Sequence, residues 1–203
     1  MNRVRGVNRV PAVSRVPVVN RVRKVLITAT PRHAPSRQAP LPPALPVATH
    51  SVRPARAEDA AELAVLSRPF VRSGALRERP APLYAVHAAD FLVAQAPGCP
   101  VEGAVGLRVY PAGPGEERGA VGVLYNFCVA GHRQGYGVGA GLLRAALATA
   151  RARSLGALFT ATTGGGDLFV QYGFAPTAAR SAPTSWVESL DPRRNARILS
   201  TVL

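Results

Sequence analysis

The sequence predicts an α/β (α+β) domain, a mixed sheet with helices on both faces. Three observations lead to this fold class. Apolar runs of strand length alternate with helical patterns after residue 50, a glycine-rich turn joins the apolar run 121–129 to a helical run from Val138, and 203 residues suffice for one sizeable core. Because ligands of such sheets bind beyond strand ends, where neighbouring strands part, we expect the functional site beside this turn.

Strands and helices are expected in turn along the first part of the domain. The segments are a strand at 51–54, a helix at 58–67, a second helix or helical turn at 70–79, a helix at 81–89, and hairpin strands at 91–95 and 104–110. Glu58 and Asp59 give the first helix an acidic first turn, which suits the helix dipole. The turn sequence Pro97-Gly98-Cys99-Pro100 indicates the hairpin.

The second part of the domain completes the sheet. After a polar loop at 111–119 we expect a strand at 121–129, a helix from 138 to about 153, a strand at 157–162, a short helix at 166–172, and a final strand pair at 174–179 and 198–203. The folded domain is therefore assigned to residues 49–203.

Residues 1–48 do not follow this pattern and are interpreted as a disordered tail and linker rich in Arg, Val and Pro. Residues 2–25 repeat with a period of six (NRVRGV, NRVPAV, SRVPVV, NRVRKV), and residues 31–46 are Pro-rich, which is typical of extended linkers. A hexapeptide β-helix is rejected because four hexads make little more than one coil, and Arg and Pro recur within them. One hypothesis places the natural start of translation near His50, where the folded pattern begins.

The net charge of +14 is concentrated in the tail. Residues 1–50 hold nine basic side chains and no acid, whereas the remainder holds sixteen basic and eleven acidic ones. Nucleic acid is not the expected partner, because the tail has no aromatic side chains on which bases could stack. The modest positive charge of the domain suits a polyanionic cofactor or an acidic substrate.

Hydropathy and cysteine usage favour a cytoplasmic protein. No apolar run reaches the length of a membrane span, so no membrane partner is expected. The two cysteines, Cys99 and Cys128, are too few for a disulfide framework, which fits a reducing compartment. Cys128 lies in an apolar run and is predicted to be buried, and no metal site is expected.

The turn before Val138 has the features of a phosphate cradle. It reads Gln134, Gly135, Tyr136, Gly137, Val138, Gly139, a Q-x-x-G-x-G pattern. Glycine lets the backbone approach a ligand closely, and the following helix directs free N–H groups and the positive end of its dipole at the turn. Such a site suits a phosphate or pyrophosphate. The pattern is neither a Walker A motif nor a complete dinucleotide fingerprint.

Strand, turn and helix together resemble the acetyl-CoA motif of the GNAT N-acetyltransferase superfamily, and Gly173-Phe174 is similar to the family's closing pair. The resemblance implies a mostly antiparallel sheet whose central strands part to hold acetyl-CoA as a co-substrate. It also implies that backbone groups of one strand hold the pantetheine and the acetyl carbonyl, at Phe127, Cys128 and Val129. The implied pyrophosphate site consists of Gln134, Gly135, Tyr136, Gly137, Val138, Gly139 and Ala140.

A narrower resemblance concerns the acceptor. Residues 67–79, Leu83-Tyr84, 89–91 and 193–199 resemble the acetyltransferase domain of N-acetylglutamate synthase, without the amino-acid-kinase domain of its long forms. In that branch, arginines that match Arg79 and Arg194 bind the carboxylates of glutamate. The chemistry agrees, because a guanidinium can hold a carboxylate through two parallel hydrogen bonds. Arg77 and Arg197 are interpreted as surface residues.

The acid–base residues depart from that branch. Its strand glutamate, the general base, corresponds to Val123 here, and Phe169 occupies the position of a tyrosine acid found in many superfamily members. Thr162 matches the hydroxyl that donates to the departing thiolate. A water relayed by Tyr125 or Asn126 is the remaining candidate for the base. The simpler interpretation of these two residues is an outward-facing strand position.

The two resemblances imply an acetyl-CoA-dependent N-acetyltransferase, an acyltransferase acting on the α-amine of an amino acid. L-Glutamate is the leading acceptor, and arginine biosynthesis is the implied pathway. Two alternatives stay open: a GNAT acetyltransferase for another small amine or a protein N-terminus, and a non-catalytic acetyl-CoA-binding regulatory module. Arg79 and Arg194 favour a carboxylated acceptor, whereas Val123 favours altered chemistry. A homodimer is also considered, because many relatives pair, although no interface is recognisable in the sequence.

Overall fold

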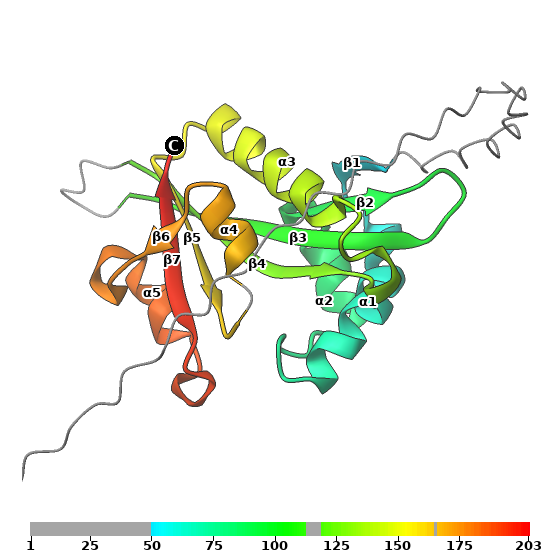
Figure 1. The fold of residues 1–203 in the computed structure, drawn as a ribbon, viewed down its shortest axis with the longest axis horizontal. Coiled ribbons are helices and arrows are strands. Elements are labelled where there is room, and N and C mark those ends of the chain that lie inside the picture. Colours follow the sequence, from blue (N-terminus) through cyan, green and yellow to red (C-terminus); the bar gives the residue numbers. More distant parts are fainter. Residues whose placement is uncertain (1–49, 113–118, 165) are drawn as a thin grey trace, which may run out of the picture. The chain divides into compact units, whose positions relative to one another are not determined.

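The computed structural model describes residues 50–112, 119–164 and 166–203, which form a seven-stranded sheet with helices on both faces (Figure 1). The tail and linker predicted over residues 1–48 lie outside the described residues. Within the described ranges, no helix is long and apolar enough to cross a membrane.

The strands of the sheet follow the order β1-β2-β3-β4-β5-β7-β6. Their bounds are β1 Ser51–Pro54, β2 Phe91–Gln95, β3 Val101–Tyr110, β4 Val121–Val129, β5 Ala157–Thr162, β6 Ala175–Pro176 and β7 Arg197–Val202. Strands β4 and β5 run parallel, and every other neighbouring pair is antiparallel. The predicted mixed, mostly antiparallel sheet is therefore confirmed.

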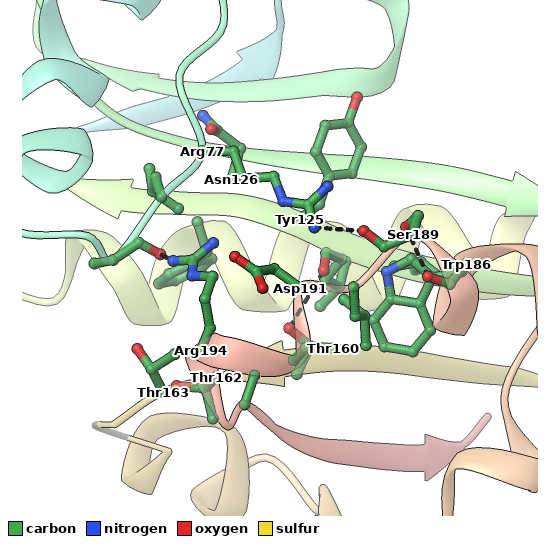
Figure 2. Close-up of a pocket in the computed structure, with 18 of the residues that line it drawn as sticks. Arg77, Tyr125, Asn126, Thr160, Thr162, Thr163, Trp186, Ser189, Asp191 and Arg194 are labelled. Atoms are coloured by element: carbon green, nitrogen blue, oxygen red, sulfur yellow. Dashed lines mark hydrogen bonds between the residues drawn. The ribbon is translucent and has the colours of Figure 1, made fainter.

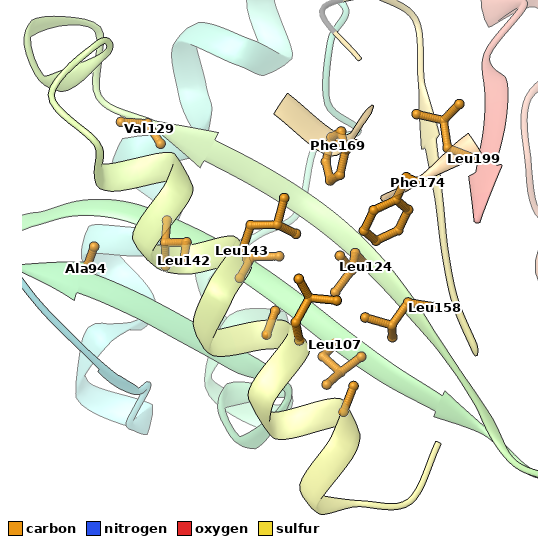
Figure 3. Packing of buried hydrophobic residues seen from close by; sticks show 14 of the residues in the cluster. Ala94, Leu107, Leu124, Val129, Leu142, Leu143, Leu158, Phe169, Phe174 and Leu199 are labelled. Atoms are coloured by element: carbon orange, nitrogen blue, oxygen red, sulfur yellow. The ribbon is translucent and has the colours of Figure 1, made fainter. Parts of the chain in front are cut away.

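Helix α3 (Val138–Ala152) covers one face of the sheet, because its buried apolar residues recur every three or four positions. Four of them are fully buried in the core that lies between α3 and strands β2, β3 and β4, namely Leu142, Leu143, Ala146 and Ala150. Figure 3 shows Leu142 and Leu143 in this core. Helix α4 (Asp167–Gln171) adds Phe169 to the same core. Truncating one such leucine to alanine costs about 2–5 kcal/mol, so this layer firmly supports the turn that precedes α3.

The opposite face is covered by α1 (Ala60–Arg72), α2 (Ala81–Val86) and α5 (Thr184–Glu188). Leu63 of α1 and Tyr84 of α2 belong to one buried cluster over strands β2 to β4. Trp186 of α5 packs at a tilt against Phe159 of β5, with ring centroids 6.4 Å apart. The two groups of helices therefore cover neighbouring parts of this face, with α1 and α2 over the end of β4 and α5 over its start.

A β-bulge in β4 redirects two polar side chains. The register between β3 and β4 shifts by one residue beyond Tyr125, and Asn126 takes a φ of 50°, a left-handed conformation that asparagine tolerates. As a result Tyr125 and Asn126 both face the cluster under α1 and α2, instead of alternating across the sheet. The Tyr125 ring lies across Gly106, where a Cβ atom would come within 2.5 Å of it.

The second helix predicted at 70–79 is wrong. Helix α1 continues through Pro69 to Arg72, because the packing of its buried face outweighs the hydrogen bond that proline removes. Residues 73–80 then form turns and irregular backbone, with Gly74 in the left-handed conformation. This segment lies along the cavity described below.

Smaller differences concern short elements. The helix predicted at 81–89 divides into α2 and a 3-10 turn at Ala88–Asp90, β3 begins at Val101, and β6 contains only Ala175–Pro176. Helix α5 has no counterpart among the predicted elements. Five helical residues after Pro183 are too few to show a helical period, and burial of Trp186 stabilises them instead.

Candidate active site

The site is built where β4 and β5 separate. The two parallel strands pair only along residues 121–124 of β4 and 157–160 of β5, and Figure 1 shows them diverging beyond this point. Backbone groups of residues 125–129 that point away from β3 therefore face a gap and not a neighbouring strand. Phe127, Cys128 and Val129 lie on this stretch, and the side-chain amide of Gln134 donates to the carbonyl of Val129 at 3.1 Å.

The glycine-rich turn lies at the end of this gap. Gly135 and Gly137 have φ values of 82° and 81°, and nothing lies within 4 Å of the positions that their Cβ atoms would occupy. Gly137 caps the 15-residue helix α3, whose first N–H groups have no helical acceptor. Open space above two glycines and a row of free N–H groups fit a pyrophosphate.

The other residues of the turn present different groups. Tyr136 is 68% exposed, and the Arg133 guanidinium lies 5.8 Å from its ring centroid. Val138 is buried in the core, so that only its backbone can serve a ligand. Gly139 and Ala140 form the first turn of α3, where a Cβ atom at position 139 would lie 3.2 Å from a neighbouring leucine.

A cavity of about 340 Å³ lies at the fork between β4 and β5 (Figure 2). Four arginines line it: Arg77, Arg79, Arg108 and Arg194. Among the described residues, Asp191 is the one carboxylate in the lining, which contains no His, Lys or Cys. The excess of positive charge suits an acceptor with more than one carboxylate.

Arg79 is held in place by Asn126 and Tyr125. Its guanidinium donates to the Asn126 side-chain oxygen at 3.2 Å and lies 5.0 Å from the centroid of the Tyr125 ring. Asn126 is 5% exposed, so the outward-facing position considered for it is wrong. Its amide also contacts Ser67 at 3.2 Å and Tyr84 at 3.3 Å. These contacts favour a positioning role for Asn126 toward Arg79.

Arg194 and Arg77 tie the segment after α1 to the C-terminal part of the chain. Arg194 donates to the backbone carbonyls of Gly74 and Ala75, and Arg77 donates to the carbonyl of Ser189. A guanidinium has five N–H groups, so both arginines retain donors for a ligand. Arg77, interpreted from sequence as a surface residue, is exposed and also lines the cavity.

The Tyr125 hydroxyl is a hydrogen-bond donor in this structure. It donates to Asp90 at 3.1 Å, and the guanidinium groups of Arg79 and Arg108 lie 5.0 and 5.3 Å from the centroid of the Tyr125 ring. Burial, followed by the negative charge of Asp90, raises the pKa of the Tyr125 hydroxyl well above its usual value. The phenol therefore stays protonated at neutral and moderately alkaline pH.

Thr162 and Val123 lie on the two diverging strands and both line the cavity. Thr162 ends β5, and its hydroxyl donates to the carbonyl of Gly164. Val123 is 1% exposed and packs in the cluster of Phe159 and Trp186, so an apolar side chain occupies the strand position at which a carboxylate base was considered.

The structure adds two charged lining residues that sequence reasoning missed, Arg108 and Asp191. A signal for Asp191 was available in the sequence, because it directly precedes Pro192-Arg193-Arg194. Arg194 of this segment was predicted to bind a carboxylate of the acceptor. Arg197 does not line this cavity. In the part of the chain that the structure describes, no group of three or more His, Cys, Asp and Glu side chains is placed to hold a metal ion.

The family profile described as "Acetyltransferase (GNAT) family" matches residues 58–169, more than half of the chain. The chain belongs to the GNAT acetyltransferase family. This assignment confirms the predicted acyltransferase class, and the family uses acetyl-CoA. The residues at the fork and the turn fit that co-substrate, as the open glycines and the unpaired edge of β4 show.

Solved structures share this GNAT fold. N-acetylglutamate synthase from Neisseria gonorrhoeae, complexed with coenzyme A and N-acetyl-glutamate, is similar with a TM-score of 0.68 and 25% identity, over 77% of this chain and 35% of that one. Rv2747 from Mycobacterium tuberculosis, in complex with CoA and NLQ, has a TM-score of 0.61 and 21% identity, over 75% of this chain and 99% of that one. Naa50 from Arabidopsis thaliana, bound to a bisubstrate analogue, has a TM-score of 0.57 and 15% identity, over 76% and 99% of the two chains.

The present chain spans about a third of the length of the Neisseria protein, with 35% of that chain covered. Among proteins with curated functions, none matches the sequence significantly. The acceptor therefore has to be argued from the cavity.

Proposed function

We propose that this protein is an amino-acid N-acetyltransferase that transfers the acetyl group of acetyl-CoA to the α-amine of L-glutamate. The observation that carries the proposal is the arginine-lined cavity at the point where β4 and β5 part. An acceptor with two carboxylates would lie there beside a thioester held along β4. The similarity to a synthase solved with coenzyme A and N-acetyl-glutamate, at 25% identity, supports the same acceptor class.

Acceptor binding is assigned to Arg79 and Arg194. The Arg79 guanidinium is oriented by Asn126 and Tyr125, and Arg194 is oriented by two backbone carbonyls. Both therefore lose little side-chain freedom when they bind a carboxylate, which lowers the entropic cost of binding. Because the two arginines come from different segments, they can select for the distance between two carboxylates.

Co-substrate binding is assigned to the turn and to the edge of β4. The N–H groups at the start of α3 would hold the pyrophosphate, and backbone groups at Phe127, Cys128 and Val129 would hold the pantetheine and orient the acetyl carbonyl. Acetyl-CoA supplies the activated acetyl group. The Thr162 hydroxyl, at the end of β5, would turn from the Gly164 carbonyl to donate a hydrogen bond to the departing sulfur.

The test is thiol release from acetyl-CoA by the purified protein with a panel of acceptors. L-Glutamate, L-glutamine, 4-aminobutyrate and the dimethyl ester of glutamate separate the contributions of the two carboxylates. The proposal predicts the highest kcat/KM for L-glutamate, with N-acetylglutamate identified by mass. A preference for an ester or for an amine without carboxylates would overturn it.

A second candidate, a non-catalytic coenzyme-binding module, is favoured by Val123, which leaves β4 without a carboxylate over the cavity. It predicts that the protein binds acetyl-CoA, as seen by calorimetry, without thiol release with any amine in the panel.

A further inference from the structure

In the part of the chain that the structure describes, Asp191 is a carboxylate without a charged partner, in a cavity lined by four arginines. Within the described residues, its one hydrogen bond is accepted from the backbone N–H of Arg193, 3.0 Å from Oδ1, and no cationic side chain lies within 4.0 Å of it. Figure 2 shows its side chain directed into the cavity, in the region of Arg194 and Arg77. One carboxylate oxygen is therefore available to a ligand.

Among the described residues, Asp191 is the one anionic group of the cavity that can accept a proton. Apart from Asp191, the lining contains Arg77, Arg79, Arg108, Arg194, Tyr110 and Tyr125. Arginine stays protonated in proteins, and the Tyr125 hydroxyl already donates to Asp90. Val123 supplies no carboxylate from β4.

We propose that Asp191 is the catalytic residue that binds the α-ammonium of the acceptor and accepts its proton, directly or through one water. The proposal rests on the amino-acid N-acetyltransferase activity proposed above. The charges of the cavity match an amino acid as a whole: arginines bind the carboxylates, and Asp191 binds the ammonium. Without Asp191, an ammonium in this cavity would face only positive charges, which would oppose its binding.

The chemistry balances without a metal or a redox partner. The ammonium transfers one proton to the Asp191 carboxylate, and the neutral amine then attacks the thioester carbonyl. The C–N bond forms, the C–S bond breaks, and the electron pair leaves with the coenzyme A thiolate. The second nitrogen proton is lost as the amide forms, the thiolate takes one proton to become a thiol, and Asp191 returns the other to solvent.

The experiment compares Asp191→Asn with Glu188→Gln in the full-length chain. Both substitutions remove one negative charge at nearly constant size, but Glu188 is exposed on α5 and lies outside the cavity lining. For Asp191→Asn we expect kcat with L-glutamate at neutral pH to fall roughly 100-fold or more, the range for loss of a general base. The difference in kcat between Asp191→Asn and the wild type should become smaller as the pH rises, because more of the amine is then deprotonated without a base. Glu188→Gln should retain wild-type kcat.

A binding measurement gives a second readout. Calorimetry with coenzyme A present compares L-glutamate with glutarate, which has both carboxylates but no amine. We expect Asp191→Asn to weaken the binding of L-glutamate roughly tenfold, because one charged hydrogen bond to the ammonium is lost. The affinity for glutarate, which has no ammonium, should stay the same or increase.

The outcomes separate the two proposals. An active wild type with an Asp191→Asn variant within threefold of it at every pH would overturn the role of Asp191 and leave the proposed function intact. If Asp191→Asn weakened the binding of glutarate as much as that of L-glutamate, Asp191 would support the cavity and not bind the ammonium. That result would also overturn the proposal. A wild type that binds coenzyme A but acetylates no amino acid would overturn both.

Discussion

At the scale of single residues, Gly137 has a left-handed backbone conformation, with a φ of 81°, and open space where a Cβ atom would lie at the N-terminus of α3. Both properties favour glycine at this position. Gly137→Glu adds backbone strain and a negative charge at the pyrophosphate site. We expect acetyl-CoA affinity, measured by calorimetry, to fall roughly 10- to 100-fold. Gly119→Glu is the control, because Gly119 has a φ of 70°, has nothing within 4 Å, and precedes the opposite end of β4. If the Gly137→Glu variant and the wild type bound acetyl-CoA with equal affinity, the turn before α3 would not be the pyrophosphate site.

Arg194 and Arg193 form a second pair for comparison. Arg194 lines the cavity, whereas Arg193 does not. Arg194→Ala should raise the KM for L-glutamate roughly 10- to 100-fold and leave acetyl-CoA affinity unchanged, because charged hydrogen bonds to a carboxylate are lost. Arg193→Ala should change neither. The carboxylate clamp is wrong if the two variants have the same acceptor KM in steady-state assays.

The two cysteines differ in reactivity. Cys128 is 2% exposed, and burial raises the pKa of its thiol to about 12, whereas Cys99 is exposed. Because the thiolate is the reactive form, a chromogenic disulfide reagent should titrate one thiol in the native protein and two after unfolding. Two fast thiols in the native protein would contradict the burial of Cys128 beneath α1.

At the scale of elements, Asp59 connects β1 to the start of α1. Its carboxylate accepts two hydrogen bonds from Arg53, at 2.7 and 2.8 Å, and one from the backbone N–H of Arg56 at 2.7 Å. The hydrogen bond from Arg53, followed by that from Arg56, lowers the pKa of Asp59 below its ordinary value, against the opposing effect of burial. Asp59→Asn should reduce the free energy of unfolding at pH 7 by about 1–3 kcal/mol in urea denaturation.

The pH dependence of this difference follows from the direction of the shift. A lowered pKa stabilises the fold above the unfolded value of 3.8, and this stabilisation is lost as the pH falls through the lower folded value. The wild type and Asp59→Asn should therefore converge in acid. Glu188→Gln, at an exposed residue of α5, should match the wild type throughout. A difference that persists unchanged in acid would argue against the ion pair.

The sequence predicted the elements with strong local patterns. The bounds of β1, β2, β4 and β5 agree with the structure, because alternating or continuous apolar runs end there at turn residues. The helix at 70–79 and the bulge at Asn126 were not predictable in this way. Whether a helix continues through Pro69, and where β3 slips against β4, depends on packing between segments far apart in the chain.

The same distinction holds for the site. The glycines of the turn could be selected from sequence because their backbone conformation is local. Arg79 and Arg194, which the family resemblance selected as carboxylate ligands, both line the cavity, and that role stays a prediction. Arg108 and Asp191 could not be selected, since only the tertiary fold brings β3 and the segment after α5 to the same cavity. Their roles remain predictions until the variants are measured.

At the scale of the whole described domain, the sheet explains why two substrates would meet at one point. Strands β4 and β5 are held together at residues 121–124 and 157–160 and separate beyond them, so the gap opens between helix α3 on one face and helices α1 and α5 on the other. The turn before α3 lies at the end of the gap that follows β4, and the arginines line a cavity at the fork itself. Under the proposed function, the gap beside β4 would hold the thioester and the arginine-lined cavity would hold the carboxylated amine.

The measurement that tests the central claim most directly is the product formed from acetyl-CoA and L-glutamate by the purified protein, identified by mass as thiol release is followed. The proposed function predicts N-acetylglutamate in equal amount to free coenzyme A. Clear coenzyme binding with no N-acetylglutamate at neutral or alkaline pH would contradict it.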